Sequence, residues 1–341
     1  MEITLQDRFR GALVGVLAGD ALGAPYELGK AADIDADFAK RGGLTAFGYQ
    51  NPFYGKTEDI KEFPAGRPTD DSDHTAALAK SLIESNGLDE KDLFYRLRSI
   101  VVNGWSPLWG GKAVGAGRTT RKMLAPETYE ESYAIPSKGA FPSNGSLMRS
   151  APMALYFAAT RPTGGIDRDM VARMSRVTHR HPLAVRCCVA YASILYELLL
   201  GYHRDGASQR AIQLGYDWDH ESGVLNLHRE EIPWQVSLAD MLADPTVHPR
   251  DPWGKPGIGD VLLTLHVALW ALYTTSSFRE GITKVVALGG DTDTYAAVAG
   301  GLLGAYYGEQ GIPPEWRNVL LGRQVMENLA DEFCIWANQS A

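Results

Sequence analysis

Residues 11–23 read GALVGVLAGDALG, and residues 295–308 read YAAVAGGLLGAYYG. Both stretches repeat glycine at every fourth position, and residues four apart share one face of an α-helix. Glycine inside a helix costs about 1 kcal/mol relative to alanine, a cost that makes sense where two backbones approach closely. We therefore predict two tightly packed central helices, which can pack against each other. The repeating glycines are Gly11, Gly15, Gly19, Gly23, Gly300, Gly304 and Gly308.

The composition is that of an ordinary globular protein. The chain has 341 residues, of which 45% are hydrophobic and 22% charged, with a formal net charge of −8. Such a charge argues against a broad nucleic-acid surface, which requires clustered Lys and Arg. Small anionic ligands remain compatible with it, because helix N-termini, a few Arg side chains or a bound metal ion can hold them.

Cysteine use and the apolar segments point to a reducing, non-membrane environment. Cys187, Cys188 and Cys334 form no CxxC pair, so we interpret them as buried thiols. The first ten residues, MEITLQDRFR, lack the apolar core of a signal peptide. The most apolar stretch, residues 261–273, is too short to span a bilayer. We expect a cytoplasmic protein that is monomeric and has no membrane partner.

Helical patterns dominate, and long alternating runs of β-branched residues are absent. We predict a single all-α domain over residues 1–341, with a central two-metal cleft. Three long connections, 28–68, 125–145 and 216–257, are rich in Gly, Pro and aromatic residues, and loops of this length tend to be functional. The predicted helices cover approximately 7–22, 73–86, 90–103, 115–124, 147–159, 168–178, 182–202, 206–215, 258–276, 278–287, 294–308 and 316–330.

Acidic side chains gather at the start of two predicted helices. Residues 69–73 read TDDSD, and residues 289–294 read GGDTDT. N-capping is one explanation, since Asp, Ser and Thr satisfy free N–H groups and favour the positive end of the helix dipole. A cap needs only one acid, however, and neighbouring carboxylates repel each other.

A shared metal site is the alternative explanation of these two clusters. Carboxylate and hydroxyl oxygens suit Mg²⁺, Mn²⁺ or Ca²⁺ rather than zinc or copper. Two acids and a hydroxyl from each cluster would hold a pair of divalent ions, with water completing the shells. The candidate metal ligands are Thr69, Asp70, Asp71, Asp291, Asp293 and Thr294.

Two further acids follow the first glycine-rich stretch. Asp20 has a structural explanation, as a helix-end charge paired to an Arg. Glu27 lies just beyond the Gly-Ala-Pro end of that helix. It can be a solvated loop acid or a carboxylate that leans over the metal site.

Several loops can contact a ligand, and each also has a purely structural explanation. In FPSNGSLMRSAP (141–152), exposed N–H groups before a helix can hold phosphate, although Asn-Gly is equally a plain turn. His179, in THRHP (178–182), can be a ligand-binding or a structural histidine. Trp105 and Trp109 can stack on a flat ring or fill core.

Taken together, these motifs resemble those of the ADP-ribosylglycohydrolase family. The resemblance runs through GALVGVLAGDALGAPYE (11–27), TDDS (69–72), NGSLMRSAP (144–152), THRHP and GGDTDTYAAVAGGLLGAYYG (289–308). It covers nearly the whole chain. That family includes the dinitrogen-reductase-activating glycohydrolase and the ADP-ribosylarginine and ADP-ribosylserine hydrolases.

The resemblance implies an all-α fold with two Mg²⁺ or Mn²⁺ ions in a central cleft. Its Thr-Asp-Asp and Asp-x-Asp-Thr ligand sets fall on the two acidic clusters described above, and its flexible acid falls on Glu27. Its His on the ribose or diphosphate side falls on His179. Its phosphate loop falls on Ser143, Asn144, Gly145, Ser146 and Leu147, and its glycine-rich loop on Gly115 and Gly117.

Two departures concern the acceptor linkage. Arginine-directed bacterial members carry an Asp in the glycine-rich loop, and Ala113 stands where we align it. The Val-Gly-Ala-Gly segment (114–117) is closer to the serine-directed hydrolases. Ser143 replaces the usual Gly before Asn144. The linkage therefore stays open, whether to arginine, to serine or to nucleic acid.

The resemblance leads us to expect an ADP-ribosyl hydrolase acting on an N- or O-linked ADP-ribosylated protein or an ADP-ribose-containing small molecule. Glu27, or a metal-binding carboxylate such as Asp70 or Asp291, would act as the base. Trp105, Trp109 or Tyr306 would stack on adenine. Two alternatives are a two-metal nucleotide-diphosphate phosphohydrolase and a non-catalytic ADP-ribose binder or structural protein.

Overall fold

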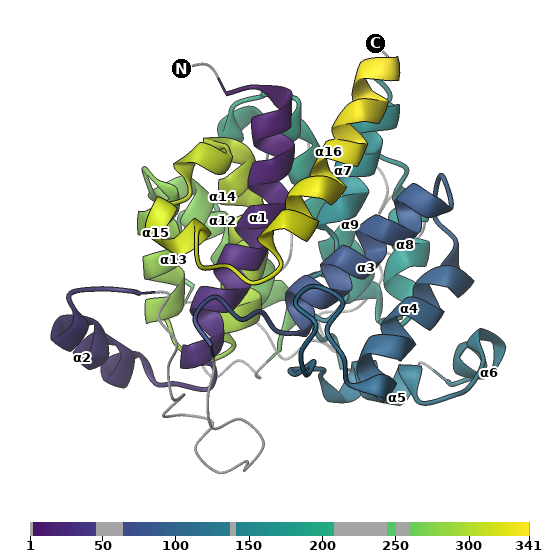
Figure 1. Ribbon diagram of the computed structural model, residues 1–341, viewed down its shortest axis with the longest axis horizontal. Helices are drawn as coiled ribbons and strands as arrows, with labels where there is room; N and C mark the ends of the chain where they lie inside the picture. The colour runs from purple at the N-terminus through teal and green to yellow at the C-terminus, as the bar shows by residue number, and fades with distance from the viewer. Residues whose placement is uncertain (1–2, 46–63, 137–140, 208–243, 250–258, 341) are drawn as a thin grey trace.

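The fold was obtained as a computed structural model, which describes residues 3–45, 64–136, 141–207, 244–249 and 259–340. Within these ranges the molecule is helical, and the β-type pairing consists of isolated bridges without a sheet. This confirms the all-α prediction. Helices α1 (Leu5–Gly23) and α14 (Thr292–Tyr307) form the centre, and the other helices pack around them (Figure 1).

The glycine stripes of α1 and α14 face each other, as predicted. The two helices run antiparallel, because Gly11 lies against Gly304 and Gly23 lies against Thr292. A Cβ atom built on Gly15 would come within 2.2 Å of the Gly300 carbonyl oxygen. The two backbones thus touch along most of the pair, and the facing glycines leave no room for a side chain between them. We refer to this contact as the glycine seam.

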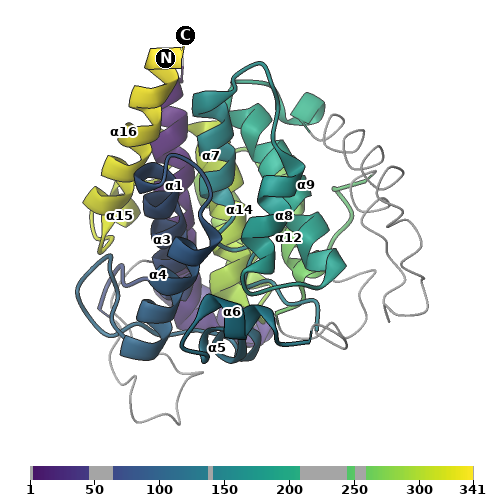
Figure 2. The same cartoon turned by 90° about the vertical axis from the view of Figure 1, so that its right-hand side faces the viewer.

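The remaining helices form two groups on either side of the seam (Figure 2). α3 packs on α4, while α16 packs on α1, α3 and α7. On the other side, α9 contacts α7, α8, α12 and α14, and α13 contacts α14. The bounds are α3 Asp70–Glu84, α4 Glu90–Asn103, α5 Arg118–Leu124, α6 Tyr129–Tyr133, α7 Ala151–Thr160, α8 Arg168–Arg176, α9 Pro182–Leu199, α12 Val261–Thr274, α13 Phe278–Ala287 and α16 Arg323–Ser340.

Helix α9 is long and apolar enough to cross a membrane by length and composition, but 89% of it is buried inside the protein. A core helix of a folded domain gives the same signal. Its buried side chains include Cys187 and Cys188, and burial raises the pKa of the Cys187 thiol well above its usual value. All three cysteines are free and buried, as the sequence led us to expect.

The sequence prediction missed a helix near the N-terminus and misplaced the last one. α2 (Ala31–Arg41) lies inside the predicted connection 28–68 and buries only Ile34. The predicted helix 316–330 is wrong: the chain forms α15 (Pro314–Arg317), turns through Gly322 at φ +88°, and then begins α16. The positive φ of Gly322 ends any continuous helix there. Most of the predicted helix 206–215 and of the connection 216–257 lies outside the described residues.

Candidate active site

The starts of α3 and α14 lie side by side where α1 ends, at the lower end of the molecule in Figure 1. Asp20, near the end of α1, ties α3 to this position. Its carboxylate accepts hydrogen bonds from the backbone N–H and the hydroxyl of both Thr69 and Ser72, at 2.5–3.0 Å. The direct partners of Asp20 are thus hydroxyls and amides at a helix start, where the sequence suggested an Arg. Burial raises the pKa of Asp20 to about 6.

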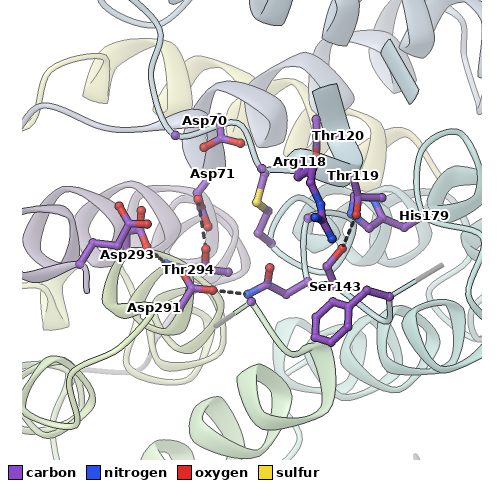
Figure 3. A pocket seen from close by; sticks show the side chains of 18 residues that line it. Asp70, Asp71, Arg118, Thr119, Thr120, Ser143, His179, Asp291, Asp293 and Thr294 are labelled. Carbon is purple, nitrogen blue, oxygen red and sulfur yellow. Dashed lines mark hydrogen bonds between the residues drawn. The ribbon is translucent and has the colours of Figure 1, made fainter. Parts of the chain in front are cut away.

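The acids of both clusters line one cavity (Figure 3). Asp71 and Thr294 join the two helices, since the Thr294 hydroxyl lies 3.4 Å from Asp71 Oδ2. Carboxylate oxygens of Glu27, Asp291 and Asp293 lie within 4.8 Å of one another, close enough for all three to contact one metal ion. Residues more than 200 positions apart therefore converge on a single point.

The unsatisfied oxygens of this cluster fit a cation. Asp71 Oδ1 and Glu27 Oε2 are buried and have no hydrogen-bond partner among the described residues, and an unpaired buried carboxylate oxygen is costly. Burial, followed by repulsion from neighbouring acids, raises the pKa of Asp70, Asp71 and Asp293 well above the usual value. The same causes raise the pKa of Glu27 to about 8. Hard oxygen ligands at this density suit Mg²⁺ or Mn²⁺.

The cavity has a volume of about 260 Å³. Its carboxylates lie at one end, and Arg118, Thr119 and His179 lie at the other (Figure 3). An elongated ligand can therefore present hydroxyls to the acidic end and a negative charge to the opposite end. The lining residues are Glu27, Asp70, Asp71, Gly115, Gly117, Arg118, Thr119, Thr120, Phe141, Ser143, Asn144, Gly145, Met148, His179, Gly259, Asp291, Asp293 and Thr294.

Asn144 positions Asp291. Its side-chain amide donates to Asp291 Oδ2 at 2.8 Å and to the Thr264 hydroxyl at 2.9 Å. Its backbone N–H donates to the Gly259 carbonyl at 3.0 Å, so the turn is anchored next to the start of α12. Asn144 was predicted from the sequence as part of a phosphate loop; the structure shows that it also orients a carboxylate of the acidic cluster.

Gly115 is the point where the glycine-rich loop meets the acids. Its φ is +107°, and a Cβ built there would lie 2.1 Å from Asp70 Oδ1. The neighbouring Val114 carbonyl accepts the Asp70 N–H at 2.9 Å. Ala113, in contrast, does not line the cavity but packs partly buried against the core. Of these two positions, Gly115 lines the cavity beside Asp70, whereas the position aligned with the family Asp does not line it.

Several predicted substrate-binding residues do not reach the cavity. Ser146 and Leu147 are fully buried behind the turn. The prediction for Trp105 is not supported, because its side chain is 60% exposed and lines a separate groove between α3, α4 and α16. Trp109 and Tyr306 are also absent from the cavity lining. Trp109 lies under the guanidinium of Arg67, which is next to the first acidic cluster in sequence, and Tyr306 lies beside His203, near the end of α14.

Thr69 takes a supporting position. Its hydroxyl lies 2.8 Å from Asp20 Oδ1 and 3.3 Å from Asp71 Oδ2, and it caps α3. Arg118, Thr119, Thr120 and Phe141 line the cavity but were missed from the sequence. The available signal was their position, since the first three directly follow the glycine-rich loop and Phe141 lies two residues before Ser143 of the Ser-Asn-Gly turn.

Comparisons with known proteins identify the family. A family model described as ADP-ribosylglycohydrolase matches residues 1–340. The chain is 26% identical over 321 residues to an ADP-ribosyl-(dinitrogen reductase) glycohydrolase of Rhodospirillum rubrum, covering 93% of this chain and 91% of that one. It is 27% identical to the ADP-ribosylarginine hydrolase Tri1 of Serratia proteamaculans, covering 96% and 79% of the two chains.

The other relatives include the ADP-ribosylhydrolase ARH3 of Bos taurus, at 27% identity with 96% and 92% coverage. A solved structure described as an ADP-ribosylglycohydrolase-related protein complex superposes with a TM-score of 0.66 and 28% identity, over 99% of each chain. The match to the family model over almost the entire length decides the assignment. This chain belongs to the ADP-ribosylglycohydrolase family.

Proposed function

We propose that this protein hydrolyses the glycosidic bond between ADP-ribose and a modified side chain, with two Mg²⁺ or Mn²⁺ ions at the acidic end of the cavity. The observation that carries the proposal is the convergence of carboxylates from α3 and α14 around buried oxygens that lack partners. The family supports hydrolysis of ADP-ribose linkages; the acceptor and the metal pair are our inference.

Residues at the acidic end of the cavity would bind the metal ions or position their ligands. Asp70 and Asp71 from α3, and Asp291, Asp293 and Thr294 from α14, would hold the metal ions. When bound, such ions orient ribose hydroxyls and lower the pKa of a water molecule. Asn144 holds Asp291 in place through its side-chain amide.

Glu27 is suited to accept a proton from the attacking water. It follows the short helix η1 (Ala24–Tyr26), and its Oε2 atom is buried without a partner beside Asp291 and Asp293. Cleavage of a ribosyl bond develops positive charge on the sugar, and the surrounding carboxylates would stabilise it. At the other end, Arg118 and the turn 143–145 would face the diphosphate.

The test is a parallel assay of arginine-, serine- and nucleic-acid-linked ADP-ribose, with and without Mg²⁺. We expect release of intact ADP-ribose from at least one linkage, and loss of release in excess EDTA. AMP as the product would indicate diphosphate cleavage instead. Tight ADP-ribose binding without turnover of any linkage would indicate a non-catalytic binder.

A further inference from the structure

The His179 ring lies between the cavity and a buried polar chain. Its side chain is only 3% exposed, yet it lines the cavity. On the inner side, Nδ1 lies 2.8 Å from the Thr178 hydroxyl oxygen. On the outer side, Nε2 faces the Ser-Asn-Gly turn, because a Cβ built on Gly145 would lie 3.0 Å from it. The protonation of Nδ1 therefore determines what Nε2 presents to a ligand.

Arg149 fixes the role of the Thr178 hydroxyl. The Arg149 side chain is fully buried, and its Nη2 donates to Thr178 Oγ1 at 2.7 Å. Its Nη1 donates to the Gly145 carbonyl, which ties the same guanidinium to the cavity turn. A guanidinium has donors only, so the Thr178 oxygen is the acceptor in this contact. The hydroxyl proton of Thr178 is then free to be donated elsewhere.

Proton accounting selects one tautomer of His179. Thr178 is 1% exposed, and among the residues that the structure describes its hydroxyl contacts only Arg149 and His179 Nδ1. If Nδ1 carried a proton, both neighbours would donate to Thr178 Oγ1, and the hydroxyl proton would be buried without an acceptor, which is costly. If Nδ1 is unprotonated, the Thr178 hydroxyl donates to it, and each donor in this chain of contacts then has an acceptor.

We propose that Arg149 and Thr178 are positioning residues that hold His179 with its proton on Nε2, so that a ring N–H points into the cavity as a hydrogen-bond donor. Its acceptor would be a phosphate or hydroxyl oxygen of bound ADP-ribose, and this part rests on the proposed function. Burial, together with the nearby charge of Arg149, lowers the pKa of His179 well below its usual value and keeps the ring neutral. A neutral ring has one N–H only, so its location decides whether the cavity gains a donor or an acceptor.

A separate set of hydrogen bonds holds the backbone of His179. The Ser175 hydroxyl donates to the His179 carbonyl at 3.0 Å and contacts the Ser146 hydroxyl at 2.9 Å. The His179 N–H donates to the Ser175 carbonyl at 2.8 Å. Ring orientation and tautomer are thus fixed from the same side, away from the cavity.

The test is ¹⁵N NMR of the metal-free protein labelled at histidine, with the His179 signals assigned by their loss in His179→Gln. We expect a protonated Nε2 and an unprotonated Nδ1 in the wild type and in Thr178→Ser, which keeps the hydroxyl. In Thr178→Val, which keeps the shape but not the hydroxyl, the signals should shift toward a mixture of tautomers. Calorimetry should show ADP-ribose binding about 10-fold weaker in Thr178→Val and about equal to the wild type in Thr178→Ser.

A protonated Nδ1 in the wild type would overturn the proposal even if Thr178→Val failed to fold. Unchanged ring signals in folded Thr178→Val would overturn it as well. The spectrum requires no ligand, so the failure of the proposed function is distinguishable. An Nε2-protonated ring in a protein that binds no ADP-ribose would support the proposed positioning of His179 by Arg149 and Thr178. It would contradict the proposed hydrolysis of ADP-ribose linkages.

Discussion

Along most of their length α1 and α14 meet as bare backbone, whereas next to the contact between Gly23 and Thr292 five carboxylates line a cavity. The seam buries small apolar groups at close range, which favours folding. The cavity buries acids with raised pKa values, which opposes folding until a cation is bound. One helix pair therefore combines a contact that favours folding with a group of buried acids that opposes it. Changes in the seam should affect stability, and changes in the cavity should affect activity.

The largest effect is expected in the seam. Gly15→Ala would place a methyl group 2.2 Å from the Gly300 carbonyl, backbone against backbone, so the two helices would have to separate. We expect the free energy of unfolding to fall by at least about 3 kcal/mol, the upper range for overpacked cores. Chemical denaturation measures it. The matched control is Gly206→Ala, where the added methyl group would meet nothing within 4 Å. If the two variants were equally stable, the claim that the backbones of α1 and α14 pack directly against each other would be contradicted.

The next effect separates activity from stability in the cavity. Asp71→Asn removes the charge of a carboxylate whose Oδ1 atom has no hydrogen-bond partner among the described residues. We expect ADP-ribose release to fall at least about 100-fold, with metal-free stability unchanged or increased because repulsion among the acids is reduced. The control is Asp73→Asn in the same helical turn, whose carboxylate accepts from Ser106 at 2.6 Å and lies outside the cavity. Similar activities of the two variants would indicate that burial alone matters.

A third effect concerns pH and metal. The pKa of Glu27 is raised to about 8 in the folded protein, from 4.5. Between these values the folded state holds a proton that the unfolded state has released, so metal-free stability should fall as pH rises from about 5 to 8. Mg²⁺ at about 100 times its Kd should raise the melting temperature by about 4 °C at pH 8.

The same Mg²⁺ concentration should stabilise the protein less at pH 5, because protons compete for the carboxylates. Thermal melts at both pH values, with Mg²⁺ or EDTA, measure the difference. The Asp71→Asn variant serves as the control, and Mg²⁺ should raise its melting temperature much less than that of the wild type. A larger Mg²⁺ effect at pH 5 than at pH 8 would be the wrong sign for a carboxylate site.

The smallest effects concern two aromatic side chains. Trp105 is exposed on a separate groove, whereas Phe141 lines the cavity and is 42% exposed. Trp105→Ala should therefore change KM less than about twofold, while Phe141→Ala should raise KM about fivefold, the loss of about 1 kcal/mol of aromatic contact. Steady-state kinetics of both variants decide the comparison. A larger effect at Trp105 would place the ligand beyond the cavity.

The sequence was most informative where residue type leaves few structural options. Glycine every four positions predicts close helix packing, and α1 and α14 confirm it. Acids at two helix starts pointed to one site, and Asp71 and Thr294 lie within 3.4 Å of each other. In both cases a local pattern would be unfavourable unless a distant partner compensated for it. The convergence could therefore be inferred without coordinates.

Features set by tertiary contacts could not be inferred in this way. Asp20 binds Thr69 and Ser72 from another helix, and no spacing in the sequence indicates that pairing. Trp105 and Phe141 are both aromatic residues in loops, and only the path of each loop decides which one reaches the cavity. α2 packs only Ile34 and Phe38 against the core, a pair too short to identify a helix inside a long connection rich in Gly and Pro.

The most direct test of the account counts metal ions. Mn²⁺ titration followed by electron paramagnetic resonance should show two ions bound per wild-type chain. The double variant Asp71→Asn with Asp293→Asn, which changes one acid on each helix, should bind fewer than one ion at the same free concentration. Two ions in the double variant, or none in the wild type at millimolar Mn²⁺, would contradict the central claim that α3 and α14 jointly hold the cations.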